Sequence, residues 1–184
     1  MEFKPAQADK MTKWTTIIFT VVVVGLAAGA LACWQLQQLE PFFGLAMMAV
    51  IFALTLGIIR LFYPLSYTVT PDGLSIRRVG AGTVFIPWAM VETAYRPEGI
   101  TIWNVTKTAG ASGLYGHFGG FRIKDVGPCW LSATNLYKLV VLHGDKNWVI
   151  SPEEPEAFLE YAKSYIEQAS SLREQLKANF PKAR

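Results

Sequence analysis

The chain has 184 residues, which leaves room for one ordinary domain and one further short segment. Hydrophobic residues make up 52% of it and the mean hydropathy is +0.27, values that indicate a membrane-embedded part. The formal net charge is only +3, and the lysines and arginines are spread along the chain rather than clustered. This distribution argues against nucleic acid as a partner.

Two uncharged apolar segments, residues 14–34 and 42–59, follow one another near the N-terminus. About twenty apolar residues of α-helix cross the hydrocarbon core of a bilayer, so the first segment is long enough to span it. The second is long enough if Arg60 and Tyr63 lie at the membrane interface. The sequence therefore predicts a helical transmembrane hairpin over residues 14–63.

Basic residues flank the predicted hairpin on both sides (Lys4, Lys10, Lys13 and Arg60), while the turn between the segments carries only Glu40. The positive-inside rule then places both ends in the cytoplasm, with residues 1–13 as a cytoplasmic tail. The expected location is the cytoplasmic (inner) membrane. A cleavable signal peptide, with residues 28–30 imitating a cleavage site, is the less favoured alternative because the apolar segment is longer than a signal peptide needs.

Gly25 and Gly29 have the G-x-x-x-G spacing that lets two helices approach closely. We expect this pair to pack within the hairpin, and contact with another membrane subunit is the alternative. No ionisable side chain lies at mid-membrane depth in either apolar segment, which argues against a transport pathway through the hairpin.

From residue 64 the pattern changes to period two, which is typical of half-buried strands. Residues 67–70 and 74–77 are predicted strands joined by the turn Pro71-Asp72-Gly73, in which each residue type favours a tight reversal. Further strands are predicted at residues 84–88, 100–103, 120–124, 130–134, 136–142 and 147–150. The regular spacing predicts an antiparallel, hairpin-connected β-domain of about seven strands.

One amphipathic helix follows the strands. Ser151-Pro152-Glu153-Glu154 has the form of a capping box, and Pro155 with Glu154 as cap is an alternative start. Apolar residues recur every three or four positions from Phe158 to Leu176. The part of the helix after residue 167 has two interpretations: a helix for oligomerisation or partner docking, or a solvated tail. We therefore assign residues 64–167 to the domain and residues 168–184 to an extension of the helix and a tail.

The segments "TVTPDGLSIRR", a strand ending in "IPW", "GLYGHFGGFRI" and "ISPEEPEAFLEYAK" resemble, in this order, a bacterial pleckstrin-homology-like (PH-like) domain over roughly residues 65–167. The resemblance implies a bent antiparallel β-barrel or sandwich capped by a C-terminal helix. Bacterial members resemble interaction or scaffold modules that are often oligomeric. The expected fold class is thus a two-helix transmembrane hairpin plus an α+β PH-like domain.

Eukaryotic relatives bind phosphoinositides through a basic cluster in the first hairpin loop. Here Arg77 and Arg78 are followed by the apolar loop 79–82, so phosphoinositide binding is not expected. Arg77 and Arg78 are nevertheless candidates for contact with anionic headgroups, together with other cations expected on the same face (Lys107, Arg122 and Lys124). Ordinary solvated strand edges are the alternative interpretation.

The segment 113–124 is rich in glycine and aromatic residues and contains the candidate ligand-facing residues Tyr115, His117, Phe118, Arg122 and Lys124. Glycine exposes backbone amides that can hold an anion. A long bent hairpin that needs glycine for its geometry is the favoured alternative.

No catalytic, metal or cofactor site is predicted. The histidines are His117 and His143, and neither has enough further ligands nearby in the sequence for a metal. We therefore expect a non-enzymatic, membrane-anchored module that recruits or assembles protein partners at the bilayer, as a homo-oligomer or as a subunit of a membrane complex. The alternative is a receptor for a lipid headgroup or small anion that uses residues 113–124.

Overall fold

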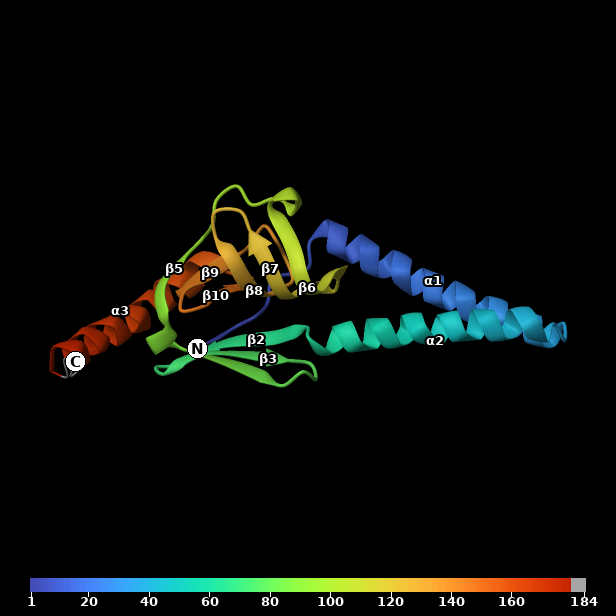
Figure 1. The fold of residues 1–184 in the computed structure, drawn as a ribbon, viewed down its shortest axis with the longest axis horizontal. Helices are drawn as coiled ribbons and strands as arrows, with labels where there is room; N and C mark the ends of the chain where they lie inside the picture. The colour runs from blue at the N-terminus through green and yellow to red at the C-terminus, as the bar shows by residue number, and fades with distance from the viewer. Residues whose placement is uncertain (180–184) are drawn as a thin grey trace.

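A computed structural model describes residues 1–179 of the chain. Two long helices form a hairpin that projects from a β-domain, and a third helix lies at the end of the domain farthest from the hairpin (Figure 1). The helices are α1 (Lys10–Gln35), α2 (Leu39–Leu61) and α3 (Pro155–Asn179).

The hairpin helices α1 and α2 are long and apolar enough to cross a membrane. Few of their residues are buried (Thr12, Ala30, Ala49 and Leu56), so most of their apolar side chains face outward, as fits a membrane anchor rather than a core helix. A Cβ atom on Gly29 would lie 3.4 Å from Leu45 Cδ1 on the facing helix, whereas one on Gly25 would meet nothing within 4 Å. Gly29 thus faces α2, and Gly25 faces open space.

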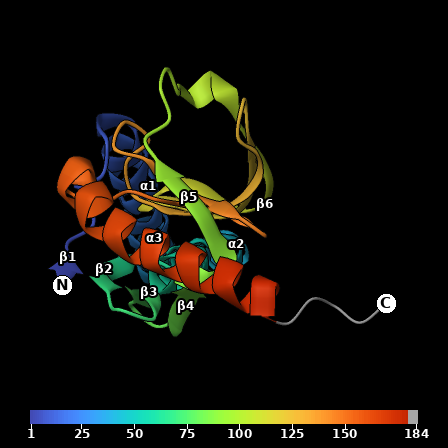
Figure 2. The same cartoon turned by 90° about the vertical axis from the view of Figure 1, so that its left-hand side faces the viewer.

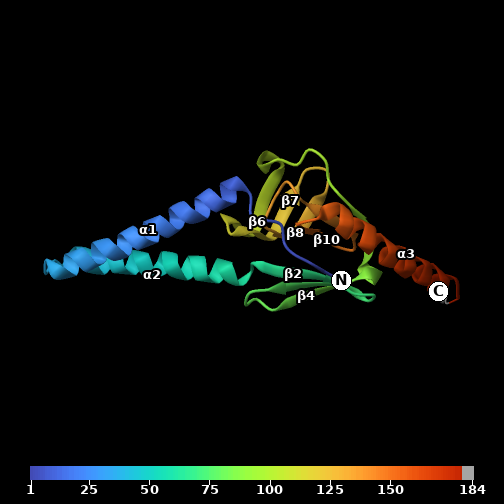
Figure 3. The same ribbon diagram turned by 180° about the vertical axis from the view of Figure 1, so that it is seen from behind.

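The residues before α1 pack on the β-domain, although the sequence analysis assigned them to a tail. Strand β1 (Glu2–Phe3) pairs with β2 (Pro64–Val69), and Phe3 packs edge-on against Phe158 of α3 at 5.3 Å between ring centroids. The Ala6 N–H donates to the Ser151 carbonyl at 2.8 Å. The start of α1 and the end of α2 therefore lie at the same end of the hairpin, against one domain (Figure 3).

The domain contains two sheets. The first has the order β1-β2-β3-β4, and the second β5-β9-β10-β8-β7-β6. The remaining strands are β3 (Gly73–Arg78), β4 (Thr83–Pro87), β5 (Val91–Tyr95), β6 (Val105–Leu114), β7 (Gly116–Ile123), β8 (Gly127–Ala133), β9 (Val140–Gly144) and β10 (Asn147–Ile150). The sheets do not close into a complete barrel. Helix α3 lies across the opening between them (Figure 2).

The core lies between the first sheet, one end of the second sheet and α3. Its largest members include Tyr67, Leu74 and Trp88 from one side and Phe158 from α3, each at most 1% exposed. Beyond residue 167, α3 continues along the same domain, because Arg173 Nη2 donates to the Val91 carbonyl at 2.7 Å. At least this part of the extension is docked rather than free.

The strand predictions were wrong at several places. The described chain forms more strands than the expected seven or so, because β1, β5 and β6 were not predicted. Residues 100–103 are not a strand, because the side chain of Asn104 bonds to the Gly99 carbonyl at 3.0 Å and its N–H to the Thr101 carbonyl at 3.0 Å, which closes a short helical turn (Ile102–Asn104).

The expected strand at 136–142 begins only at Val140, after a crossover formed by residues 134–139. The crossover places β10 between β9 and β8, so β10 pairs in parallel with β8 and the domain is not purely antiparallel. Ser151 holds the start of the crossover in place: its Oγ accepts the Thr134 N–H at 2.8 Å.

Candidate functional site: a cleft at the base of the helical hairpin

The tip of the β6–β7 hairpin lies between α1 and α2, where both helices reach the domain (Figure 1). Tyr115 forms the tip with φ of +58°, a left-handed conformation that reverses the chain in one residue. Its N–H donates to Thr16 Oγ1 of α1 at 3.0 Å, and its ring centroid lies 5.5 Å from the Arg60 guanidinium of α2. The tip therefore contacts both helices and keeps them apart.

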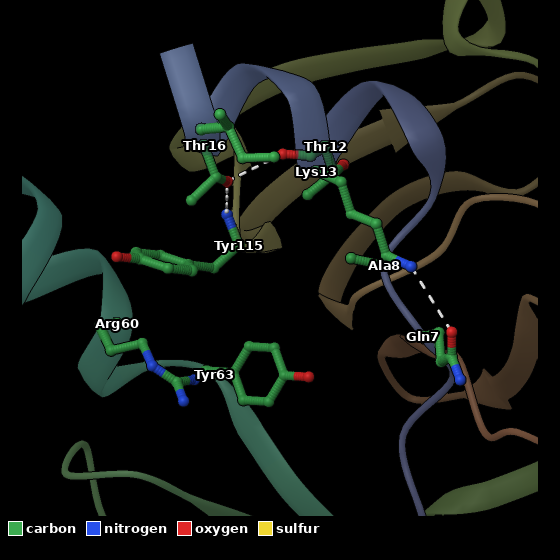
Figure 4. A pocket seen from close by; sticks show the side chains of 9 residues that line it. Gln7, Ala8, Thr12, Lys13, Thr16, Arg60, Tyr63 and Tyr115 are labelled. Carbon is green, nitrogen blue, oxygen red and sulfur yellow. Dashed lines mark hydrogen bonds between the residues drawn. The ribbon is translucent and has the colours of Figure 1, made fainter. Parts of the chain in front are cut away.

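Beside the tip is a cleft of about 550 Å³, which we call the juxtamembrane cleft (Figure 4). Its charged lining residues are both cations, Lys13 from α1 and Arg60 from α2, and no carboxylate of residues 1–179 lines it. The other lining residues are Gln7, Ala8, Thr12, Thr16, Ile17, Tyr63 and Tyr115.

Two tyrosines hold the Arg60 side chain. Its guanidinium lies 4.4 Å from the ring centroid of Tyr63 and 5.5 Å from that of Tyr115. Stacking uses the flat face of a guanidinium, so the N–H groups at its edge stay available for an anion. Among the described residues, no Asp or Glu forms an ion pair with Arg60. Lys13, which completes the charge of the cleft, is hydrogen-bonded only weakly, to Gln7 Oε1 at 3.5 Å.

A buried chain of polar side chains links the β6–β7 hairpin to the start of α1. His117 is 3% exposed; its Nδ1 lies 2.8 Å from Ser112 Oγ, and its Nε2 lies 3.9 Å from Asp9 Oδ2. Asp9 caps α1, because its Oδ1 accepts the Thr12 N–H at 2.8 Å. Burial alone would raise the pKa of Asp9, but His117 and the Thr12 N–H outweigh it and hold this pKa at about 2. Asp9 is therefore an ionised anchor for the hairpin.

The other predicted site residues do not gather in one place. Phe118 is buried and Arg78 half-buried, and both line a second cavity on another side of α2. Arg122 and Lys124 are exposed at the end of β7 away from the tip, and Arg77 is exposed on β3 of the other sheet. The single cationic face expected from these residues is thus not formed.

The loop between β3 and β4, residues 79–82, is turned against the membrane helix. The N–H groups of Gly80 and Ala81 both donate to the Leu61 carbonyl at the end of α2, each at 3.0 Å. A Cβ on Gly80 would lie 2.6 Å from Leu61 Cδ2, so glycine permits the close approach. This loop is therefore occupied by an internal contact with α2.

The cleft was not predicted from the sequence. Lys13 and Arg60 served there only to orient the hairpin, and Tyr63 was expected to be an interfacial aromatic residue. Asp9 was overlooked, although an Asp directly before an apolar helical run is a recognisable N-cap pattern. Among the described residues, no three His, Cys, Asp or Glu side chains come together as a possible metal site.

Two sheets with α3 laid across their opening define a PH-like fold. The sequence profile described as "Bacterial PH domain" matches residues 65–166, which is more than half of the chain. The chain belongs to this family. Comparisons with curated proteins and with solved structures give no match. The matched region begins within β2, so residues 1–9, the hairpin and every lining residue of the cleft except Tyr115 lie outside it.

Proposed function

We propose that this protein is a membrane-anchored PH-like module of the cytoplasmic membrane that binds the phosphate-bearing headgroup of an anionic phospholipid in the juxtamembrane cleft. The observation that carries the proposal is Arg60, stacked between Tyr63 and Tyr115 and facing Lys13 across a cleft without carboxylates. A held guanidinium with free N–H groups and a nearby ammonium match the charge and the acceptor oxygens of a phosphate.

The depth of the cleft supports a lipid as the source of this phosphate. Lys13 directly precedes the first spanning segment and Arg60 directly follows the second, so both lie at the level of the headgroups. Each juxtamembrane cation near anionic lipid contributes about 1 kcal/mol. The basic residues around the two hairpin ends favour the cytoplasmic side for the domain.

The test compares lipid retention by the full-length protein and by the double variant Lys13→Gln/Arg60→Gln, using native mass spectrometry after purification in a phosphatidylglycerol–phosphatidylcholine mixture. We expect the preference for phosphatidylglycerol to fall roughly tenfold to thirtyfold, since two cations are lost at about 1 kcal/mol each. The matched control, Lys107→Gln/Lys124→Gln, removes the same charge from an exposed position of β6 and from the exposed turn after β7, and should keep the preference. Equal loss in both double variants, or displacement of the lipid by millimolar inorganic phosphate, would overturn the proposal.

A second candidate function is assembly with a protein partner or another copy of the chain. It is favoured by aromatic side chains exposed on the domain, with Trp103 at 90% and Tyr137 at 71%. Because the anchor already places the domain at the bilayer, these surfaces are free for a protein. Sedimentation of the detergent-solubilised protein tests self-association. If the wild type sediments as a monomer, with the same sedimentation coefficient as the double variant Trp103→Ser/Tyr137→Ser, self-association is contradicted.

A further inference from the structure

A second cavity, of about 430 Å³, lies on another side of α2 and shares no lining residue with the juxtamembrane cleft. We call it the apolar cavity. Its wall is apolar apart from one guanidinium, that of Arg78. Helix α2 contributes Ile58, Ile59 and Phe62, and the sheets contribute Ala109, Gly110, Ala111, Phe118, Gly119 and Trp130.

The cavity stays open because glycine residues, which have no side chain, form its base. Gly110 and Gly119 are paired across β6 and β7 with φ of +127° and +115°. A Cβ on Gly110 would lie 2.1 Å from the Phe118 carbonyl oxygen, so no side chain fits there. With alanine on either side of Gly110, the strand offers nothing large enough to fill the space. The glycine-rich composition of this hairpin thus produces a hollow as well as a bend.

The one polar group of the cavity has an unmet hydrogen-bonding requirement. Arg78 Nε is buried and has no hydrogen-bond partner among the described residues. The guanidinium carbon lies 5.9 Å from the Phe62 ring, and burial lowers the pKa of Arg78. A guanidinium stays protonated even so, and a partly buried cation without a carboxylate is stabilised by an anionic ligand.

The position of the cavity specifies where a ligand comes from. Ile58 and Ile59 belong to the last turn of α2 and are followed by Arg60, so the cavity meets the boundary between hydrocarbon and headgroups. Lipid of the same leaflet is the amphiphile present at this depth. A volume of about 430 Å³ also lies in the range of ordinary small-molecule sites, roughly 300–1,000 Å³.

We propose that the apolar cavity holds one acyl chain of an anionic phospholipid from the same leaflet, with the phosphate of that lipid on Arg78. The chain covers apolar wall that is otherwise in contact with water, and the phosphate accepts from the unpaired Nε–H. This site is separate from the headgroup site of the proposed function, and each can fail without the other.

The test uses full-length protein in phosphatidylcholine nanodiscs that contain phosphatidylglycerol with a photoreactive diazirine in the middle of one acyl chain. After illumination, the labelled peptides are mapped by mass spectrometry. We expect label on the β6–β7 hairpin and on the peptide with Trp130, in addition to label on the spanning helices. Label confined to the spanning helices would overturn the proposal.

Substitutions of two cavity residues, with control variants, and one competitor make the test specific. Ala111→Leu fills the cavity and should reduce hairpin labelling several-fold, while Thr106→Leu, exposed on the same strand, should not. Arg78→Gln should reduce labelling by phosphatidylglycerol more than labelling by the matching phosphatidylcholine probe, whose phosphate is offset by the choline cation. Undiminished labelling of folded Ala111→Leu, or complete displacement of the phospholipid probe by a free fatty acid, would refute the proposal that the cavity binds a phospholipid. Persistence of the label in Lys13→Gln/Arg60→Gln separates this site from the juxtamembrane cleft.

Discussion

Removing the charge of Asp9 tests whether the buried link to His117 stabilises the junction between the domain and α1. Asn is as good an N-cap as Asp, so Asp9→Asn keeps the cap hydrogen bond and removes only the charge. A pKa of about 2 in the folded protein, against an ordinary value of 3.8, corresponds to roughly 2 kcal/mol of stability. Asp9 also borders a water-accessible cavity, which screens part of this interaction. We therefore expect a loss of about 1–2 kcal/mol at neutral pH.

The sign of the pH dependence follows from the lowered pKa. The stabilising contribution is fully present above the ordinary pKa of 3.8 and is lost as the pH falls through about 2, with roughly half of it gone by pH 3. The assay is thermal unfolding in detergent, followed by tryptophan fluorescence, for the wild type and Asp9→Asn between pH 7 and pH 3.

At neutral pH the variant should unfold roughly 2–8 °C lower than the wild type, and the difference should narrow toward pH 3. The control Glu98→Gln removes an exposed carboxylate from a loop and should change little. Equal unfolding temperatures of Asp9→Asn and the wild type at pH 7, or a difference that grows with acid, would refute the reasoning.

Three further substitutions, two of them with a matched control variant, test the packing. Phe3→Ala should lower the free energy of unfolding by about 3–5 kcal/mol if the residues before α1 belong to the core, and denaturant unfolding measures this. Gly119→Ala should cost at least about 2 kcal/mol, because the new Cβ would lie 2.4 Å from a backbone oxygen, whereas Gly82→Ala, which has positive φ but open space, should cost about 1 kcal/mol. Gly29→Leu should separate the hairpin helices and lower the thermal stability in detergent, while Gly25→Leu, which meets open space, should not.

Local patterns in the sequence were enough to predict the elements whose structure depends on neighbouring residues. The apolar segments predict the hairpin, Pro71-Asp72-Gly73 predicts the first turn, and Pro155 after Glu154 was one of the two starts proposed for α3. In each case the information lies within a few residues.

Pairings between distant segments could not be predicted in this way. Strand β1 is only two residues long, which is too short to show an alternation of apolar and polar residues. It forms because Phe3 packs into a core built by α3 and the first sheet. The parallel pairing of β10 with β8 depends on the path of residues 134–139, which no local propensity encodes. The same holds for the cleft, because Lys13 and Arg60 come together only through the helix pair and the Tyr115 turn between them.

The chain enters the domain on both sides of the hairpin, and neither crossing has a linker. Asp9 joins the core-facing residues 1–8 directly to α1, and β2 starts at Pro64, three residues after α2 ends. A domain held at two such points cannot rotate about the hairpin as a domain on one flexible linker does, so its orientation and depth at the bilayer are fixed. Loop 79–82 adds a further contact with α2, because the Gly80 and Ala81 N–H groups donate to the Leu61 carbonyl. The groups suited to a phosphate, Arg60 and Arg78, lie beside α2 at the two positions where we propose that lipid binds.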